Sequence, residues 1–412
     1  MQAIIGRFPP LRGHIQQVAR LLNQPEYFWI TRPLMAFLIT RTIVFLGAYL
    51  AEIGIPSIAG AGFYHVNPNN VWLDVWARWD SAFYIRIVEN GYWFVPGQQS
   101  AVAFFPLYPL MVSLLAPIFG TLAAGILVSN ICLFGALIFL YKLTEMEFDA
   151  ASAGRTVFYI AAFPMSFFFT SVYTESTFLF FSVSTMYFAR KKMWAWAGLF
   201  GLLCASSRIV GVVIWGIVGL EWLRSHSWTL GTLHKRAAWG NLLNALKTDW
   251  LNLIAICMIP LGLLSYMVFL NHEFGDPVAF STTQSAWGRE MLGPFTVVSR
   301  DIARLVGGNF LTGDIWWHVI LDLGAYFAVL GIAVSIWRRL GTSYALYCII
   351  SIVIPSMSGT GSLSRYAQVI FPMFMLLGYW GNRQWLDRAL TISFSVMLGI
   401  LTTMFVNWIF VA

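Results

Sequence analysis

Charged residues are scarce in this 412-residue chain. Asp, Glu, Lys and Arg make up only 10% of it, whereas soluble domains carry roughly a quarter. Hydrophobic residues make up 58%, and no polar stretch is long enough to fold as a soluble domain of its own. We therefore expect an all-α polytopic membrane protein in which residues 1–412 form a single membrane-embedded domain.

The chain also lacks the short motifs of several enzyme classes. It has no Walker loop, no G-x-G-x-x-G, no H-E-x-x-H and no Cys/His pairing with zinc spacing, so nothing supports nucleotide hydrolysis or zinc catalysis. The G-x-S-x-G elbow of serine hydrolases is missing as well. The four cysteines lie inside apolar segments, which argues against a disulfide framework. We expect neither a metal site nor a cofactor.

The formal net charge is +7, but the basic residues do not form a polar face. They stand in ones to threes beside apolar segments, which is typical of topology signals and of contacts with membrane lipids. We expect no nucleic-acid partner.

Eleven apolar segments are candidates for membrane-spanning helices, because a span needs about 20 mostly apolar residues. They lie near residues 34–52, 121–142, 155–171, 174–189, 194–207, 209–223, 250–270, 318–337, 343–357, 366–381 and 390–410. Several are shorter than a full span, which predicts tilted, broken or half-depth helices.

A further apolar run at residues 103–119 decides the topology. If it spans the bilayer, the basic clusters at residues 190–192, 234–236 and 338–339 lie outside; if it lies at the interface, they are all cytoplasmic. The positive-inside rule favours the interfacial arrangement, and three prolines in the run also suit it.

This topology places both termini and the loops. We expect a cytoplasmic amphipathic lead-in at residues 1–31, a C-terminus outside, and two large outer loops at residues 53–120 and 271–317, the first with juxtamembrane helices. The outer loops lack an N-x-Ser/Thr sequon, which favours a bacterial plasma membrane over the membrane of the endoplasmic reticulum.

The first outer loop carries an aromatic stripe at helical spacing. Its members are Trp72, Trp76, Trp79, Phe83 and Ile87. On one continuous helix, Asp74 and Arg78 would lie on the opposite, wet face as a solvated ion pair. Asp80 would lie at the margin of the stripe. It is a catalytic carboxylate, a helix cap or a member of a structural ion pair, and the spacing leaves these alternatives open.

We single out four further charged residues at or inside apolar segments. Glu175 is either a functional acid or an N-terminal helix cap. Arg208 and Arg365 stand on the expected outer side as phosphate ligands or as snorkelling anchors. Arg41 is about two turns into the first segment, where it either snorkels inward or meets a lipid phosphate.

Several stretches together resemble the PIG-V family of mannosyltransferases, including its shorter bacterial members. They are RWDSAFYIRIVENGY, AFFPLYPL, SVYTESTFLFFS, SSRIVG and GDPVAFSTTQSAWGR. The resemblance runs from about Phe37 to Phe371, and the first two blocks in tandem are its most specific part. It implies a GT-C glycosyltransferase that takes a sugar from a polyprenyl-phosphate carrier on the non-cytoplasmic side.

The resemblance also implies roles for particular residues. Asp80 would be the acid of the family's Trp-Asp motif and the general base of an inverting transfer, in which the carrier phosphate leaves. Arg208 and Arg365 would stabilise that phosphate, with Arg289 and His272 behind them. The residues expected at the substrate are Glu175, Trp79, Phe105, Tyr108 and Arg86.

Two other functions compete with this interpretation. A transporter or flippase of lipid-linked sugars would also use Arg and Glu inside the membrane, but we find no internal repeat. A non-catalytic scaffold subunit of a glycosylation complex would leave Asp80 replaceable. Our expectation is a mannosyltransferase that acts as a monomer, with a polyprenyl-phosphate-mannose donor and a lipid or glycolipid acceptor.

Overall fold

The computed structural model describes residues 24–55, 66–67, 69–232, 234–307 and 316–411. Within these ranges the chain is helical, with α-helices and short 3-10 turns and no strand. Residues 1–23, most of the expected lead-in, lie outside the described part.

Each of the eleven expected segments contains a helix or a pair of helices. These are α3 (Phe28–Gly54), α7 (Thr121–Glu147), α8 (Ala150–Ala162), α9 (Glu175–Arg190), α10 (Trp194–Ala205), α11 (Val213–Ser225), α13 (Trp250–Cys257) with α14 (Leu261–Phe274), α17 (Trp316–Leu340), α18 (Thr342–Ser356), α20 (Phe371–Trp380) and α21 (Gln384–Val406). In length and composition α3, α7, α17 and α21 can cross a membrane, and α13 with α14, bent by 43° at their break, make a fifth span if the pair crosses as one. These are the helices of a multi-pass membrane protein.

The remaining helices are short, as the sequence predicts. Those with 10 to 16 residues extend about 15 to 24 Å, less than the ~30 Å hydrocarbon core. The segment at residues 155–171 is one of the broken ones, because α8 ends at Ala162. Pro164 disfavours helical backbone just before it, and the phenylalanines that follow form the 3-10 turn η3 (Ser166–Phe169).

Arg41 stabilises the break between α8 and η3 and does not act as a lipid anchor. Its side chain is buried at 3% exposure inside α3. It donates hydrogen bonds to the carbonyls of Ala161 and Ser166 at 2.9 and 2.8 Å, and to the hydroxyl of Thr170 at 2.8 Å. Because the chain between α8 and α9 is buried and not α-helical, these carbonyls need donors other than the amides of an α-helix, and the guanidinium provides them.

The first outer loop does not form the continuous helix expected for residues 72–87. It consists of α4 (Val71–Asp74), α5 (Ser81–Asn90), η2 (Ala101–Ala103) and α6 (Leu107–Phe119). Between α4 and α5, Trp79 adopts a φ of +55°, which turns the chain out of helical geometry. The 13 residues of α6 extend about 20 Å, too short to cross a bilayer alone.

The break also buries the pair that was expected in water. Nη1 of Arg78 lies 2.7 Å from Oδ2 of Asp74, and their side chains are only 1% and 4% exposed. Arg78 also donates to the carbonyl of Val406 at 3.0 Å and lies 3.8 Å from the carboxylate of Glu52. This pair therefore ties the first loop to the ends of α3 and α21.

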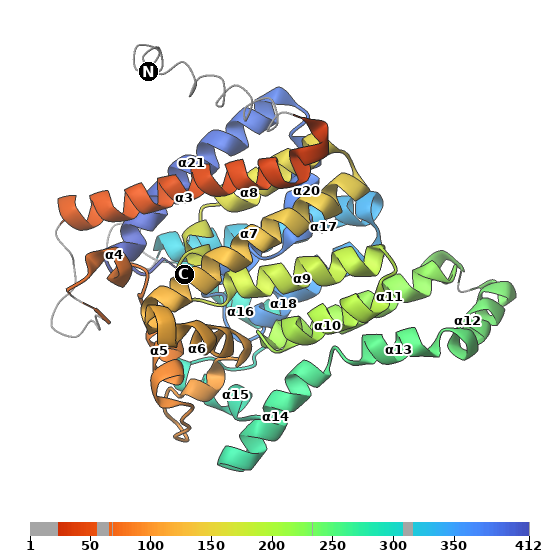
Figure 1. Ribbon diagram of the computed structural model, residues 1–412, viewed down its shortest axis with the longest axis horizontal. Coiled ribbons are helices and arrows are strands. Elements are labelled where there is room, and N and C mark those ends of the chain that lie inside the picture. The colour runs from red at the N-terminus through yellow and green to blue at the C-terminus, as the bar shows by residue number, and fades with distance from the viewer. Residues whose placement is uncertain (1–23, 56–65, 68, 233, 308–315, 412) are drawn as a thin grey trace.

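These loop elements gather at one end of the helical bundle. Figure 1 shows α4, α5, α6 and α15 (Ala279–Thr282) at this end, together with the C-terminus. At the opposite end lies α12 (Arg236–Thr248), whose first residue belongs to one of the basic clusters. Glu175 and Arg190, at the two ends of α9, are separated by about 23 Å along the axis.

Candidate active site

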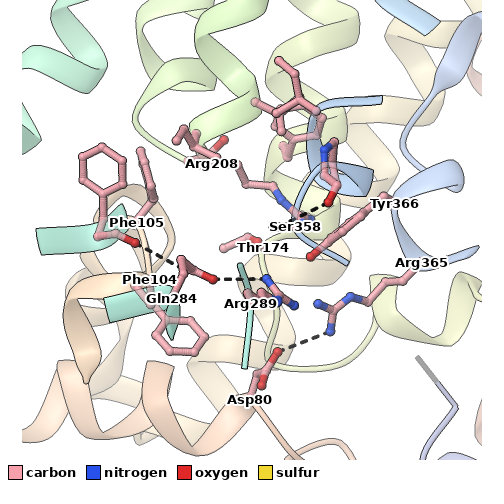
Figure 2. Close-up of a pocket in the computed structure, with 18 of the residues that line it drawn as sticks. Asp80, Phe104, Phe105, Thr174, Arg208, Gln284, Arg289, Ser358, Arg365 and Tyr366 are labelled. Carbon is pink, nitrogen blue, oxygen red and sulfur yellow. Dashed lines mark hydrogen bonds and ion pairs between the residues drawn. The ribbon is translucent and has the colours of Figure 1, made fainter. Parts of the chain in front are cut away.

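A cavity of about 320 Å³ lies where the first outer loop meets the start of α9. The chain segments after α10, α15 and α18 complete its wall. Its charged lining residues are Asp80, Glu175, Arg208, Arg289 and Arg365. Phe105 lines it as well, so six of the residues singled out from the sequence come together here. Figure 2 shows Arg289 and Arg365 with their guanidinium groups turned toward the space beside Asp80.

The backbone before α5 fixes the position of Asp80. A φ of +55° at Trp79 is unusual for a bulky residue and costs about 1–3 kcal/mol. The hydroxyl of Tyr173 stabilises this turn, because it donates to the carbonyl of Arg78 at 3.0 Å and accepts from the amide of Asp80 at 3.2 Å. Burial raises the pKa of Tyr173 well above its ordinary value, which keeps the phenol protonated and able to donate.

The carboxylate of Asp80 is not used as a helix cap. Asp80 precedes the first residue of α5, but its side chain makes no capping hydrogen bond. Its Oδ2 instead lies 3.3 Å from Nη1 of Arg365, and the side chain remains 35% exposed. The acid is thus paired but still open to a molecule in the cavity.

Glu175 holds two guanidinium groups from deep inside the wall. Its Oε1 lies 3.0 Å from Nη1 of Arg208 and 3.4 Å from Nε of Arg365. The Glu175 side chain is 1% exposed, against 17% for Arg208 and 8% for Arg365. Arg208, Glu175, Arg365 and Asp80 therefore form a continuous row of alternating charges.

Positive charge exceeds negative charge in the cavity. Three guanidinium groups face two carboxylates. Burial alone would lower the pKa of Arg365, but the facing acids and phenols raise it well above its ordinary value, so its charge is permanent. Such a lining suits an anion with several oxygen acceptors. In the described part of the chain, no three His, Cys, Asp or Glu side chains come together as a metal site requires.

Tyr366 stands among the three arginines, and the sequence did not single it out. The guanidinium carbons of Arg208 and Arg365 lie 4.9 and 5.5 Å from the centre of its ring. Burial would raise the pKa of this phenol, but Arg289 and the other two arginines lower it to about 8. Its position next to Arg365 was the only signal available from the sequence.

Asp322 supports the segment that carries Arg365 and was also missed. Its carboxylate accepts from the amides of Ser362 and Ser364 at 3.1 and 2.8 Å and from the hydroxyl of Ser364 at 2.7 Å. It therefore fixes the start of the short helix α19 (Leu363–Ala367). An acid inside an apolar segment is costly, and this was the signal in the sequence that could have found it.

Four residues expected at the substrate or its phosphate do not line this cavity: Trp79, His272, Arg86 and Tyr108. The side chain of His272, at the end of α14, is 82% exposed and lies 2.9 Å from its neighbour Glu273. Arg86 is on the exposed side of α5, over the ring of Trp93. Tyr108 is fully buried, where its hydroxyl donates to the carbonyl of Gly125 and joins α6 to α7. Arg86 and Tyr108 stand in blocks that resemble the family, and His272 precedes one of them, but none of the three side chains lines the cavity.

Comparison with solved structures defines the class of this fold. The structure of ArnT from Cupriavidus metallidurans bound to undecaprenyl phosphate matches 91% of this chain and 75% of that chain, with a TM-score of 0.51 and 12% identity. The apo oligosaccharyltransferase of Archaeoglobus fulgidus matches 93% of this chain with a TM-score of 0.46 and 14% identity. The chain spans 56% of the length of that oligosaccharyltransferase. The fold is that of the GT-C membrane glycosyltransferases.

The family follows from the sequence. The family model described as mannosyltransferase (PIG-V) matches residues 27–285, more than half of the chain. The chain therefore belongs to the PIG-V mannosyltransferase family, as its sequence blocks predicted. A search of curated proteins finds no match. Asp80, Glu175 and Arg208 lie within the matched residues. Arg289 and Arg365 lie beyond them, and the fold brings these two residues to the same cavity.

Proposed function

We propose that this enzyme is an inverting mannosyltransferase. It moves mannose from polyprenyl-phosphate-mannose to a hydroxyl group of a lipid-linked or glycolipid acceptor. The observation that supports this most directly is the shared cavity of Asp80 and three arginines, since the reaction needs one base for the hydroxyl and positive charge for the phosphate.

The arginines bind the phosphate of the donor in this mechanism. Arg208, Arg289 and Arg365 present guanidinium groups, whose planar donors match the oxygens of a phosphate. Glu175 is too deeply buried to be a first choice for a sugar hydroxyl, and it acts here by positioning Arg208 and Arg365.

Asp80 is the general base. A donor phosphate competes with its carboxylate for Arg365, which releases the carboxylate to accept a proton from the acceptor hydroxyl. The acceptor oxygen forms a bond to the anomeric carbon while the bond from that carbon to the phosphate oxygen breaks. The electron pair of the broken bond leaves with the polyprenyl phosphate, whose growing charge the arginines stabilise.

The apolar part of the wall gives the prenyl chain a path to the lipid. Ile209, Met291 and Ile354 line the cavity and are 44%, 74% and 37% exposed. Exposed apolar side chains beside a charged cavity suit a ligand with a phosphate head and a hydrocarbon tail.

We place this cavity on the non-cytoplasmic face of the membrane, with the N-terminus in the cytoplasm. The separation of α12 from the loop elements supports this, because a basic cluster lies at the other end of the bundle. A bacterial plasma membrane and a monomeric enzyme remain our proposals from the sequence.

The configuration of the product tests this function. The purified full-length enzyme is incubated with polyprenyl-phosphate-mannose and a set of lipid and glycolipid acceptors, and the product is analysed by NMR. We expect mannose to be transferred with the opposite anomeric configuration to that of the donor. A product that retains the donor configuration, or no transfer with any acceptor, contradicts the proposal.

A further inference from the structure

A second cavity of about 870 Å³ adjoins the first. The two share a wall made of Trp287, Arg289, Ser358, Gly359 and Gly361. The second cavity is completed by the start of α17, the end of the chain after α21, and the amphipathic helix α16 (Pro294–Gly307). Nothing in the mechanism above uses this space.

The turn at Trp79 places two consecutive residues in the walls of different cavities. Trp79 lines the second cavity, while the next residue, Asp80, lines the first. The backbone turn with a φ of +55° at Trp79 lies directly before Asp80. A molecule in the second cavity therefore lies beside the residue that precedes Asp80, on another side than a donor phosphate held by Arg208 and Arg365.

Aromatic rings form much of the second cavity. Trp79, Trp408 and Phe410 line it as one group, with ring centres of Trp79 5.6 Å from Trp408 and 5.3 Å from Phe410. The electron-rich face of an aromatic ring attracts the weakly positive C–H groups of a sugar ring. Such walls suit a sugar better than a peptide backbone, whose amides need hydrogen-bond partners.

Positive charge is in excess at the mouth of this cavity. Arg300 and Arg304 share one acid, Asp301, at 3.7 and 2.9 Å, and this acid also accepts a hydrogen bond from Thr360. The side chains of Arg300 and Arg304 are 44% and 64% exposed, whereas Asp301 is 5% exposed. One carboxylate thus faces two guanidinium groups that remain accessible to a further anion.

The other charged groups of the cavity do not reverse this balance. Arg289 stands in the shared wall, and Asp322 is engaged by Ser362 and Ser364. Among the arginines and aspartates that line the cavity, three arginines face two aspartates. A ligand with a negative group is therefore favoured over a neutral one.

We infer that the second cavity binds the acceptor, and that the acceptor is a sugar carrying an anionic group such as a carboxylate or phosphate. The sugar ring packs on Trp79 and on Phe410, which is 44% exposed, and its negative group pairs with Arg300 and Arg304. The name "acceptor" rests on the proposed function, but the binding of an anionic sugar does not and is tested separately.

Photolabelling tests the ligand without requiring turnover. Octyl glucuronide and octyl glucoside, each with a photoreactive group in the octyl chain, form a pair that differs only in the charge at one carbon. They are crosslinked to the full-length enzyme in detergent, and the labelled peptides are identified. We expect the glucuronide to label peptides of the second cavity with about tenfold higher affinity than the glucoside, the effect of one charge-assisted hydrogen bond.

Two variants and a competitor complete the experiment. Arg304→Gln removes an exposed charge. It is expected to lower the affinity for the glucuronide to about the affinity for the glucoside. Arg338→Gln, an exposed arginine outside both cavities, is the matched control and is expected to change nothing. Undecaprenyl phosphate is expected to leave the labelling in place, because it occupies the first cavity.

Several results would overturn the inference. They are equal labelling by both glycosides, labelling outside the second cavity, full displacement by undecaprenyl phosphate, and an unchanged preference in Arg304→Gln. Labelling as expected together with no mannose transfer to any acceptor would contradict the proposed function and leave the anionic-sugar site intact. Mannose transfer without specific labelling would contradict the anionic-sugar site and leave the proposed function intact.

Discussion

Nη1 of Arg365 lies 3.3 Å from Oδ2 of Asp80, although 285 positions separate the two residues in the chain. Nε of the same guanidinium lies 3.4 Å from Oε1 of Glu175. Arg365 is therefore divided between a deeply buried acid and one that is 35% exposed. An incoming phosphate exchanges more readily with the exposed acid, so the buried one keeps the arginine in place while Asp80 is released.

Replacing Glu175 tests the positioning part of this arrangement. Glu175→Gln leaves the guanidinium groups of Arg208 and Arg365 in the wall without their shared carboxylate. We expect the free energy of unfolding to fall by about 3–5 kcal/mol, the usual cost of removing one partner from a buried ion pair. Thermal unfolding in detergent measures it, with Glu89→Gln on the exposed side of α5 as the control. Equal stability of the two variants would contradict the positioning role.

Asp322 is expected to act on donor binding through Arg365. Asp322→Ala removes three hydrogen bonds from the start of α19, each worth about 1.5–3 kcal/mol because the acceptor is charged. The donor KM should rise at least tenfold, whereas Asp322→Asn, which keeps an oxygen for Ser364, should restore most of the affinity. A fall in kcat with an unchanged donor KM in both variants would argue against this role.

Tyr366 predicts a pH dependence of donor binding. With its pKa lowered to about 8, the phenol is neutral below that pH and negatively charged above it. The phenolate offsets part of the positive charge that attracts the phosphate, so the donor KM should rise as pH increases through about 8. The limiting slope is about tenfold per pH unit. Donor KM is measured from one unit below to one unit above that pKa, in the wild type and in Tyr366→Phe, which should show no such rise. An identical rise in both enzymes would assign the effect to another group.

The buried pair in the first loop is expected to be structural. Arg78→Gln leaves Asp74 buried without its cation and removes the hydrogen bond to Val406, so the unfolding free energy should fall by about 3–5 kcal/mol. Arg86→Gln changes the same residue type nearby but on the exposed side of α5, and it should alter neither stability nor transfer by more than a small amount. Similar melting temperatures for the two variants would contradict the burial of Arg78.

The sequence predicted the helical segments well because bilayer depth imposes a minimum length of apolar residues. It was less able to predict where helices end inside those segments. Residues 155–171 look like one span, yet Pro164 ends the helix and Arg41 donates to buried carbonyls at the break. The hydrogen-bond donor to the Ala161 carbonyl stands 120 positions away in the chain, so the sequence around Ala161 does not reveal it.

The same limit applies to the site. Asp80, Glu175 and Arg208 stand in blocks that resemble the family, and the structure brings them to one cavity. The helical wheel misplaced Asp74 and Arg78, because it assumed regular backbone through Trp79. Tyr366 and Asp322 owe their roles to contacts between distant segments, which no spacing rule reveals.

The central claim is that Asp80 is the base, and one comparison tests it most directly. Mannose transfer from polyprenyl-phosphate-mannose is measured for the wild type, Asp80→Asn and the exposed control Glu89→Gln, together with undecaprenyl phosphate binding and thermal unfolding. We predict that Asp80→Asn lowers kcat by about 10²–10⁴-fold, the usual contribution of a general base, while it still folds and binds the phosphate. Transfer at the wild-type rate by a folded Asp80→Asn enzyme would contradict the account.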